Sequence, residues 1–553
     1  MAAFRAGAGA IKSPPRKCRY QCLIHHAINM TQQSLHEYSQ YARMLIGQKN
    51  WQGAASIAGQ MQQQFSDEAE GYFIGGVVAK NTGRVSASLE QFESALEKDE
   101  ARHDAAIELA ELYTSESRFG DALTLLDNYQ QKLANSSYYL LLAAKVFTWL
   151  GLHERAWQAL NQANKVQPET DSILARLAEC AVLLGRIDVA EPIYKRLIKK
   201  YPHFQKHHYD YSKLKRAENN EHVQQMKQML QQNGQPPQNN IYLYYALGKE
   251  LEDLEQWQEA FSYYEKAGNA ILSNANYSVD KDIQTINDVI GLCSREWLAS
   301  EENTARDEHT TPVFIVGLPR TGTTLIERVL ASHQEVESAD ETFFFPTAIN
   351  LEAGIKRFSE IDAEMISRAA NSDLQSVANR YREMVSYRLS GKSHFIDKYP
   401  FNFLLLGFIA KAFPKAKLIY LHRQPLDACF AMFKQSYFKF SYSLDDLARY
   451  YAAHDQLRQH WFDVLGDRLI EVSYETFVAT PEASTRQLLD ELGLEFDPAC
   501  LEFYNNPAAS ATASTLQVRE KVHTRSVGKW QHFSNELTPL MSFLEQKGIL
   551  SIS

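Results

Sequence analysis

The chain has 553 residues, of which 45% are hydrophobic and 22% charged, and its formal net charge is −10. This length exceeds a single ordinary core, and the composition excludes a largely disordered or low-complexity protein. The negative charge argues against a general nucleic-acid binder, and six sparse, irregularly spaced cysteines argue against a disulfide framework.

The N-terminal segment, residues 1–29, is basic but lacks the apolar core and cleavage site of a secretion signal. Uninterrupted apolar runs such as 403–410 are much shorter than the roughly 20 residues that a membrane span requires. We therefore expect a disordered leader at 1–29 and a cytoplasmic protein with no membrane span.

A pattern recurs every 34 residues in the first half of the chain. Turn-forming segments are followed after five residues by a small side chain and after nine residues by a large apolar one. The turns fall at Gly83, Ser117, Gly151 and Gly185, the small residues are Ser88, Ala122, Ala156 and Ala190, and the large ones are Phe92, Leu126, Leu160 and Tyr194. A small residue lets two helices approach closely, and a large one fills the groove between stacked units.

This 34-residue unit resembles the tetratricopeptide repeat. The resemblance implies about six or seven helical pairs stacked into a solenoid, with a face that binds a protein partner. A generic helical bundle would not explain four matches at one period. We assign residues 30–275 to the repeat domain and 276–311 to a linker helix.

The sequence pattern changes at Pro312, where apolar runs typical of β-strands begin to alternate with helical stretches. Such alternation indicates a mainly parallel sheet with crossover helices. The sequence therefore predicts two folds in one chain: an all-α solenoid followed by an α/β domain over residues 312–553.

The sharpest motif follows the first predicted strand and reads Gly-Leu-Pro-Arg-Thr-Gly-Thr-Thr over residues 317–324. A strand, a glycine loop and a helix together can hold a phosphate, because backbone N–H groups converge on the anion. The spacing nearly matches the P-loop of triphosphate enzymes, but Thr323 replaces the lysine. We expect a P-loop-like phosphate site with Arg320 as its cation, not a site built for triphosphate hydrolysis.

The loop also resembles the 5′-phosphosulfate loop of sulfotransferases, which use 3′-phosphoadenylyl sulfate (PAPS) as sulfuryl donor. Later segments follow that family's order over residues 312–531, and with the repeats the chain resembles a bacterial tetratricopeptide–sulfotransferase class related to tyrosylprotein sulfotransferases. The resemblance implies transfer of a sulfuryl group to an acceptor hydroxyl on a protein, a glycan or a small molecule, with protein tyrosine as one candidate. It implies no metal.

The resemblance assigns roles to individual residues. Glu341 matches the general base, Lys398 a lysine beside the transferring group, and Arg423 the arginine of the 3′-phosphate; Arg320 joins the first two as catalytic. The residues that match cofactor-binding positions are Arg320, Thr321, Gly322, Thr323, Thr324, Arg423, Tyr474, Gln517, Val518, Arg519 and Lys529.

Two positions depart from the family pattern. Ala431 replaces a serine that contacts the 3′-phosphate, so one hydrogen bond is lost. Phe343 replaces an arginine that helps receive acidic peptides, which argues against an acceptor tyrosine flanked by acidic residues.

Two other functions stay open. A P-loop kinase or NTPase is disfavoured by Thr323 and by the lack of an apolar run ending in aspartate for magnesium. A non-catalytic repeat scaffold with a degenerate nucleotide domain is favoured by Ala431. The site residues also have structural alternatives, such as a pairing of Lys398 with the neighbouring Asp397.

Overall fold

The computed structural model describes residues 34–300, 310–355, 361–510, 512 and 514–550. The leader expected at 1–29 lies outside these residues. The described chain forms two compact units, one of residues up to 116 with 124–133, the other of residues 117–123 and everything from 134 onward. In this described part no helix has both the length and the apolar character needed to cross a membrane.

Ten helices of similar length follow one another through the repeats. They are α2 (Leu35–Gly47), α3 (Trp51–Gln64), α4 (Ala69–Asn81), α5 (Val85–Lys98), α6 (His103–Ser115), α7 (Phe119–Leu133), α8 (Ser137–Trp149), α9 (His153–Val166), α10 (Asp171–Leu183) and α11 (Ile187–Lys200). The predicted all-α repeat region is confirmed.

The turns confirm the 34-residue period. Gly83, Ser117, Gly151 and Gly185 all adopt left-handed backbone, with φ of 73°, 61°, 71° and 73°. Lys49, one period earlier, has φ of 57° and extends the series by one unit. Glycine suits such turns because it has no Cβ, whereas Ser117 and Lys49 adopt this conformation at some cost.

The small residues of the pattern lie where helices touch. Ser88, Ala122, Ala156 and Ala190 are fully buried. The Ser88 hydroxyl donates to the carbonyl oxygen of Gly76 at 2.9 Å, so α5 sits directly against α4. The predicted reason for the small side chains, close approach within a pair, is therefore confirmed.

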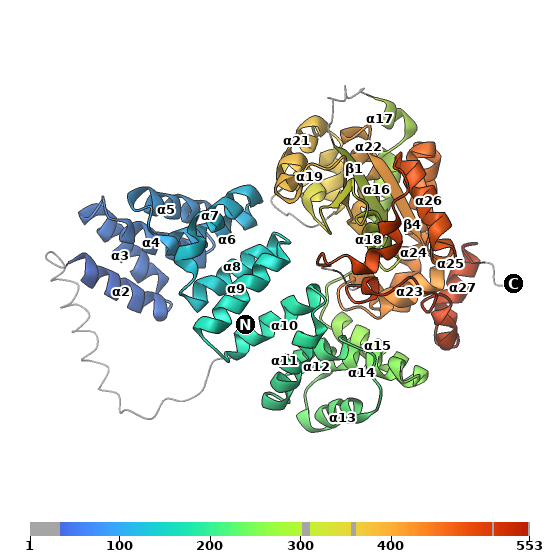
Figure 1. Ribbon diagram of the computed structural model, residues 1–553, viewed down its shortest axis with the longest axis horizontal. Coiled ribbons are helices and arrows are strands. Elements are labelled where there is room, and N and C mark those ends of the chain that lie inside the picture. The colour runs from blue at the N-terminus through green and yellow to red at the C-terminus, as the bar shows by residue number, and fades with distance from the viewer. Residues whose placement is uncertain (1–33, 301–309, 356–360, 511, 513, 551–553) are drawn as a thin grey trace. The chain divides into compact units, whose positions relative to one another are not determined.

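The last helices of this region pack into the second domain. They are α12 (Gln205–Ser212), α13 (Glu221–Asn233), α14 (Ile241–Asp253), α15 (Trp257–Leu272), α16 (Val279–Leu292) and α17 (Arg295–Ala299). On α15, Trp257 stacks on His532 at 4.2 Å and Phe261 on Phe433 at 5.3 Å between ring centroids. The pair α14–α15 thus shares one hydrophobic core with the α/β domain (Figure 1). The boundary at residue 275 stays a prediction.

Five strands form the sheet of the α/β domain, in the order β2-β3-β1-β4-β5, and every neighbouring pair is parallel. They are β1 (Thr311–Gly317), β2 (Val336–Ser338), β3 (His394–Asp397), β4 (Lys417–His422) and β5 (Leu469–Ser473). The predicted parallel sheet is confirmed.

Helices cover both faces of the sheet. On β1, Val313 and Ile315 belong to one apolar cluster, and Phe314 and Val316 to the other, as the period of two in a strand requires. The first cluster includes α18 (Thr323–Leu330), α25 (Tyr474–Ala479) and α26 (Pro481–Leu492). The second includes α19 (Phe344–Glu352), α20 (Ala363–Ala369), α21 (Leu374–Val385), α22 (Leu406–Ala412), α23 (Pro425–Phe433), α24 (Leu444–Leu465) and α27 (Thr538–Gln546).

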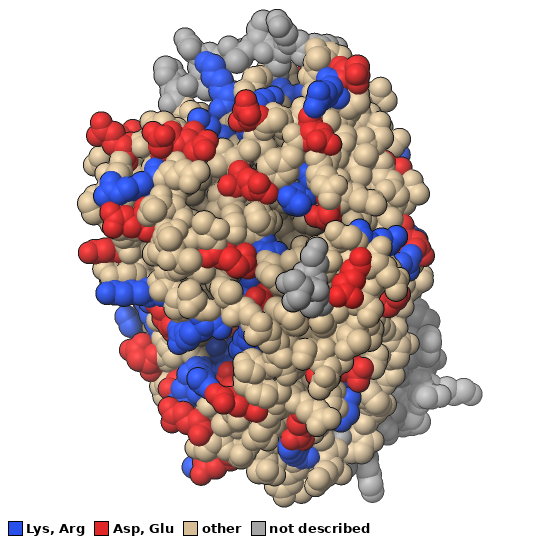
Figure 2. All heavy atoms as spheres, turned by 90° about the vertical axis from the view of Figure 1, so that its right-hand side faces the viewer, with Lys and Arg blue, Asp and Glu red and all other residues tan. Residues whose placement is uncertain are grey.

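The sheet brings the predicted site segments to one edge. Since β1, β3 and β4 are parallel neighbours, their carboxyl ends meet, and ligands of open α/β sheets bind outside that edge. The segments that leave there begin at Gly317, Lys398 and Arg423. On the side where the C-terminal helices lie, basic and acidic side chains are interspersed over the surface (Figure 2).

Candidate active site

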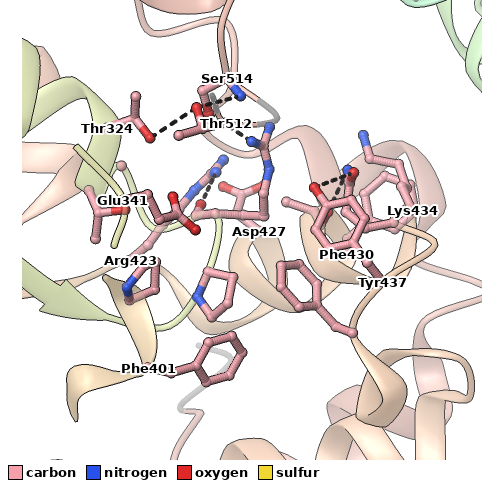
Figure 3. A pocket seen from close by; sticks show the side chains of 18 of the residues that line it. Thr324, Glu341, Phe401, Arg423, Asp427, Phe430, Lys434, Tyr437, Thr512 and Ser514 are labelled. Carbon is pink, nitrogen blue, oxygen red and sulfur yellow. Dashed lines mark hydrogen bonds between the residues drawn. The ribbon is translucent and has the colours of Figure 1, made fainter. Parts of the chain in front are cut away.

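A cavity of about 1260 Å³ lies at this edge of the sheet. Its walls come from the loop after β1, the start of α18, the segment before α19, the helix α23, Thr512 and the segment 514–529. Helices α14 and α15 of the repeat region and α16, within the segment assigned as linker, complete it through residues such as Glu252, Tyr264 and Thr285. Figure 3 shows Glu341, Arg423, Asp427 and Lys434 around this space.

The two glycines of the loop are required by geometry. Gly317 and Gly322 have φ of 145° and 105°. A Cβ on Gly317 would lie 2.3 Å from the carbonyl oxygen of Leu421, and one on Gly322 would lie 2.5 Å from the ring of Tyr474. Side chains at either position would therefore push the loop away from β4 or from α25.

The loop presents donors without acceptors. The amides of residues 322–324 open α18 and have no acceptor among the residues that the structure describes. The Arg320 guanidinium donates to Ser514 at 2.7 Å and to Gln517 at 3.3 Å, and its buried Nε has no described partner. Unfilled amides at a helix N-terminus beside a cation suit an anion.

Glu341 stands at the cavity with Lys398 behind it. The Lys398 ammonium is fully buried and forms ion pairs with Glu341 and, at 3.8 Å, with Glu327. Burial disfavours the charge of Lys398, but the two carboxylates outweigh it and raise its pKa. Burial raises the pKa of Glu327 to about 7, although Lys398 opposes that shift. Lys398 therefore pairs with these carboxylates, and no ion pair joins it to Asp397 among the described residues.

Backbone pairing fixes this arrangement. Beyond the end of β2, the Ala339 N–H donates to the carbonyl oxygen of Ile396 at 2.8 Å, and the Lys398 N–H donates to that of Asp340 at 3.3 Å. These bonds continue the parallel ladder of β2 and β3 to Glu341. The base candidate is thus held by the sheet and not by a free loop.

The expectation that no apolar run ends in aspartate is wrong, because β3 ends at Asp397. This carboxylate accepts hydrogen bonds from Tyr381 at 2.9 Å, Thr342 at 3.1 Å and Asn402 at 3.3 Å. It is fully buried, and burial raises its pKa to about 7 against these donors. It does not line the cavity, so its contacts tie together the segments that carry Glu341 and Lys398.

Arg423 directly follows β4 and contacts the loop of residues 317–324. Its guanidinium lies 4.7 Å from the ring centroid of Tyr474, donates to the carbonyl oxygen of Arg320 at 3.0 Å and also donates to that of Ser526. Within the described residues it has no carboxylate partner, so its charge is not neutralised by an ion pair.

Most of the predicted residues meet at the cavity. Those that line it are Arg320, Gly322, Thr323, Thr324, Glu341, Arg423, Tyr474, Gln517, Val518 and Lys529. Thr321 instead donates to the carbonyl oxygen of Leu318, and Arg519 donates to those of Leu183 and Ala508, outside the lining. Lys398 is covered by Glu341. The individual roles of all these residues stay predictions.

Several lining residues carry polar groups that sequence reasoning missed. Thr512 accepts from Thr324 at 3.3 Å, and Ser514 accepts from Arg320. Lys434 and Glu252 form an ion pair at 2.8 Å. Lys434 follows Ala431 by three residues, a spacing that places both on one face of a helix, so the sequence could have indicated Lys434 as a neighbour of position 431. Nothing in the sequence points to Glu252, which lies 182 residues from Lys434.

Aromatic side chains line the cavity beside Glu341. Phe343, which is 45% exposed, lies 4.8 Å from Tyr399 between ring centroids, and Tyr399 lies 5.8 Å from Phe401. Phe401 in turn lies 6.1 Å from Phe438. This row forms an apolar, aromatic wall next to the base candidate.

Comparison with known proteins agrees with the loop and the sheet. Residues 312–498 match the model described as "Sulfotransferase family". An uncharacterized protein of Aquifex aeolicus is 26% identical over 459 residues, which cover 81% of this chain and 60% of that protein. Protein-tyrosine sulfotransferase 1 of Danio rerio is 25% identical over 234 residues, covering 39% of this chain and 65% of that protein.

Among solved structures, the sulfotransferase domain of the Synechococcus PCC 7002 olefin synthase is 20% identical, with a TM-score of 0.32. The match covers 46% of this chain and all of that domain. The chain spans less than two thirds of the length of the Aquifex and zebrafish proteins. Residues 312–498 therefore resemble the sulfotransferase family, and they follow the helical repeats.

Proposed function

We propose that this protein is a sulfotransferase that moves a sulfuryl group from PAPS to an acceptor hydroxyl, with protein tyrosine as the first candidate acceptor. The observation that carries the proposal is the position of Glu341 on the same cavity as the loop of residues 317–324. A base candidate and an anion-holding loop therefore line the same cavity. Sulfuryl transfer requires this arrangement, because the base must reach the acceptor hydroxyl while the loop holds the anionic donor.

The donor set fits a sulfated nucleotide. PAPS supplies a sulfuryl group held in a mixed anhydride with the 5′-phosphate. The unpaired amides of residues 322–324 and the guanidinium of Arg320 would hold the anionic oxygens, and the unpartnered Nε atoms of Arg320 and Arg423 leave donors for it. Thr323 stands where the P-loop of triphosphate enzymes has a lysine, which disfavours binding of a nucleoside triphosphate in this loop.

The proposed chemistry uses Glu341 as the base. Its carboxylate would take the proton of the acceptor hydroxyl as the oxygen attacks, and Lys398, which pairs with it, would orient that carboxylate. Arg320 and the loop amides would stabilise the negative charge that grows on the leaving bisphosphate. Lys398 lies behind Glu341, so in this arrangement it acts through the carboxylate.

The aromatic wall of Phe343, Tyr399 and Phe401 supports an acceptor with an aromatic ring. A phenol could stack there with its hydroxyl toward Glu341, since rings pair favourably at centroid distances of about 4.5–7 Å. We further propose that the repeat region recruits a protein that carries the acceptor or a partner of it. The cytoplasmic location stays a prediction.

A transfer assay with ³⁵S-labelled PAPS tests the proposal. Wild-type protein should label a phenol or a tyrosine peptide, and Glu341→Gln should slow this by about 10²–10⁴-fold while leaving binding of adenosine 3′,5′-bisphosphate intact. Magnesium-dependent ATP hydrolysis without sulfuryl transfer would instead favour a P-loop NTPase. Absence of any nucleotide binding would favour the scaffold.

A further inference from the structure

A second glutamate lies against the lysine that pairs with the base candidate. Glu327, on α18, is 4% exposed, and one of its carboxylate oxygens lies 3.8 Å from the Lys398 ammonium. The same ammonium forms the ion pair with Glu341. Glu341 lines the cavity, but neither Glu327 nor Lys398 is among its described lining residues. One buried cation therefore joins a carboxylate that reaches the cavity to a carboxylate that does not.

The other oxygen of Glu327 is held by the strand that leads to Glu341. The Ser338 hydroxyl, at the end of β2, donates to this oxygen at 2.7 Å and accepts from the Asp340 N–H at 2.9 Å. A hydroxyl that donates to a carboxylate stabilises its ionised form. The Glu327 side chain is therefore fixed at both oxygens, between the segment that carries the base candidate and the lysine that pairs with it.

The surroundings of Glu327 balance its two protonation states. Burial and the neighbouring carboxylate of Asp340 disfavour the ionised form. Lys398, the Ser338 hydroxyl and Arg328 of the same helix favour that form. Burial outweighs these three groups and raises the pKa of Glu327 to about 7. This side chain therefore changes its charge near neutral pH.

The charge of Glu327 decides how strongly Lys398 acts on Glu341. When Glu327 is ionised, two carboxylates share one ammonium, and Glu341 takes up a proton more readily. When Glu327 is neutral, the ammonium acts on Glu341 alone and makes it a weaker base, because a cation stabilises the carboxylate form. A weaker base removes a proton from an acceptor hydroxyl more slowly, so the rate of that step should follow the charge of Glu327.

We infer that Glu327 is a positioning residue that sets the basicity of Glu341 through Lys398. The inference rests on the proposed function, because it takes Glu341 as the base. The proton still passes from the acceptor hydroxyl to Glu341, and Glu327 changes only how favourable that transfer is. Glu327 follows Thr324 by three residues on α18, so the helix that opens with the anion-holding amides also carries this control.

The pH profile of kcat tests the inference, measured with saturating labelled PAPS and a phenol acceptor. Glu327→Gln is close in shape and stays neutral, so it should match wild type at about pH 5.5, where Glu327 is protonated in wild type. Above about pH 8, wild type should be about three- to tenfold faster, because only wild type gains the second carboxylate charge. The ratio of the two kcat values cancels the titration of the acceptor, and its midpoint should lie at about pH 7.

Ser338→Ala gives a second readout in a chain that keeps Glu327. Loss of the donating hydroxyl disfavours ionised Glu327, so the rise of kcat with pH should move upward by about one pH unit. Binding of adenosine 3′,5′-bisphosphate, measured by calorimetry, should change by less than about threefold in both variants, since neither residue lines the cavity. If Glu327→Gln fails this folding check, the profile of Ser338→Ala decides.

Glu335→Gln is the matched control, because Glu335 directly precedes β2 and its exposed carboxylate accepts from Ser393 at 3.1 Å. Its kcat should stay within about twofold of wild type at every pH. A Glu327→Gln ratio that is the same at every pH, or a Ser338→Ala profile that does not move, would overturn the inference while the proposed function stands. Wild-type protein that transfers no sulfuryl group at any pH would overturn the proposed function and the inference with it.

Discussion

The Thr342 hydroxyl donates to the carboxylate of Asp397 at 3.1 Å, and each of these residues adjoins a member of the Glu341–Lys398 ion pair. A buried hydrogen bond and an ion pair therefore run side by side between the segment after β2 and the end of β3. The buried hydrogen bond sets the spacing of the ion pair, whose lysine is also buried, so the base candidate is oriented from beneath.

Thr342→Val should test this orientation. Valine keeps the shape but removes the donor, so Asp397 loses one of its three side-chain partners. We expect kcat for sulfuryl transfer to fall by about three- to tenfold, with little change in bisphosphate affinity, because one hydrogen bond contributes about 0.5–1.5 kcal/mol. Thr148→Val, which removes only a bond within α8, is the control. A proportional loss of binding would show a general structural defect instead.

Asp397 should also impose a pH dependence on stability. Its pKa in the folded protein is raised to about 7 by burial, against an ordinary value of 3.8. An acid with a raised pKa binds protons more tightly in the folded state, so its contribution is fully present below about pH 4 and is lost as pH rises through about 7. Wild type should therefore lose stability relative to Asp397→Asn over that interval.

Chemical denaturation at several pH values measures this effect. The difference in unfolding free energy between wild type and Asp397→Asn should shrink as the pH rises from 4 toward 8, roughly following one titrating group. Glu327, whose pKa is also raised to about 7, remains in both proteins and cancels in the comparison. A difference that stays constant with pH would contradict the assignment.

Much of the fold could be read from the sequence, because the signals were local. The 34-residue spacing of Gly83, Gly151 and Gly185 reports turns with positive φ, and the Gly317–Gly322 spacing reports a loop that no larger residue allows. Parallel pairing then follows from strands that alternate with helices. The phosphate-binding loop of residues 317–324 could be predicted for the same reason, because its residues are adjacent in the sequence.

The rest could not be read because it depends on contacts between distant segments. Glu252 and Lys434 are separated by 182 residues, and no sequence pattern near either residue predicts that they form an ion pair. The sequence suggested Asp397 only as a partner of Lys398, because its burial and its three hydrogen-bond donors appear only in the folded chain. Arg519 matched a cofactor position, yet its guanidinium contacts the carbonyl of Leu183 in α10.

Gly322→Ala should damage nucleotide binding. Its φ of 105° is costly for alanine, and the new Cβ would meet the Tyr474 ring at 2.5 Å. The ring cannot move without disturbing Arg423, which lies over it. We expect bisphosphate affinity to fall by about tenfold or more, since left-handed backbone alone costs about 1–2 kcal/mol and the clash adds to it.

Gly354→Ala separates these two causes. Gly354 has φ of 69°, but a Cβ there would meet nothing within 4 Å, and the residue lies outside the cavity lining. It should cost stability of about 1–2 kcal/mol and leave affinity unchanged. If calorimetry gave both variants the same affinity as wild type, the close approach of the loop to Tyr474 would have no part in binding.

Truncation should distinguish the two parts of the helical region. A chain that begins at Ala134 keeps the second compact unit almost whole, including α14 and α15. A chain that begins at residue 276 loses the partners of Phe433 and His532 and the carboxylate that pairs with Lys434. Each aromatic face exposed in this way costs about 1.5–3 kcal/mol, and Lys434 and Lys529 are left without their counter-charge.

We therefore expect the chain from Ala134 to elute as a folded monodisperse species in size-exclusion chromatography and to bind adenosine 3′,5′-bisphosphate within about threefold of the full-length affinity. The chain from residue 276 should aggregate or bind with at least about tenfold lower affinity. A folded, fully binding product from residue 276 would mean that the α/β domain needs neither α14 nor α15 to fold or to bind the nucleotide. Loss of binding already in the chain from Ala134 would contradict this expectation.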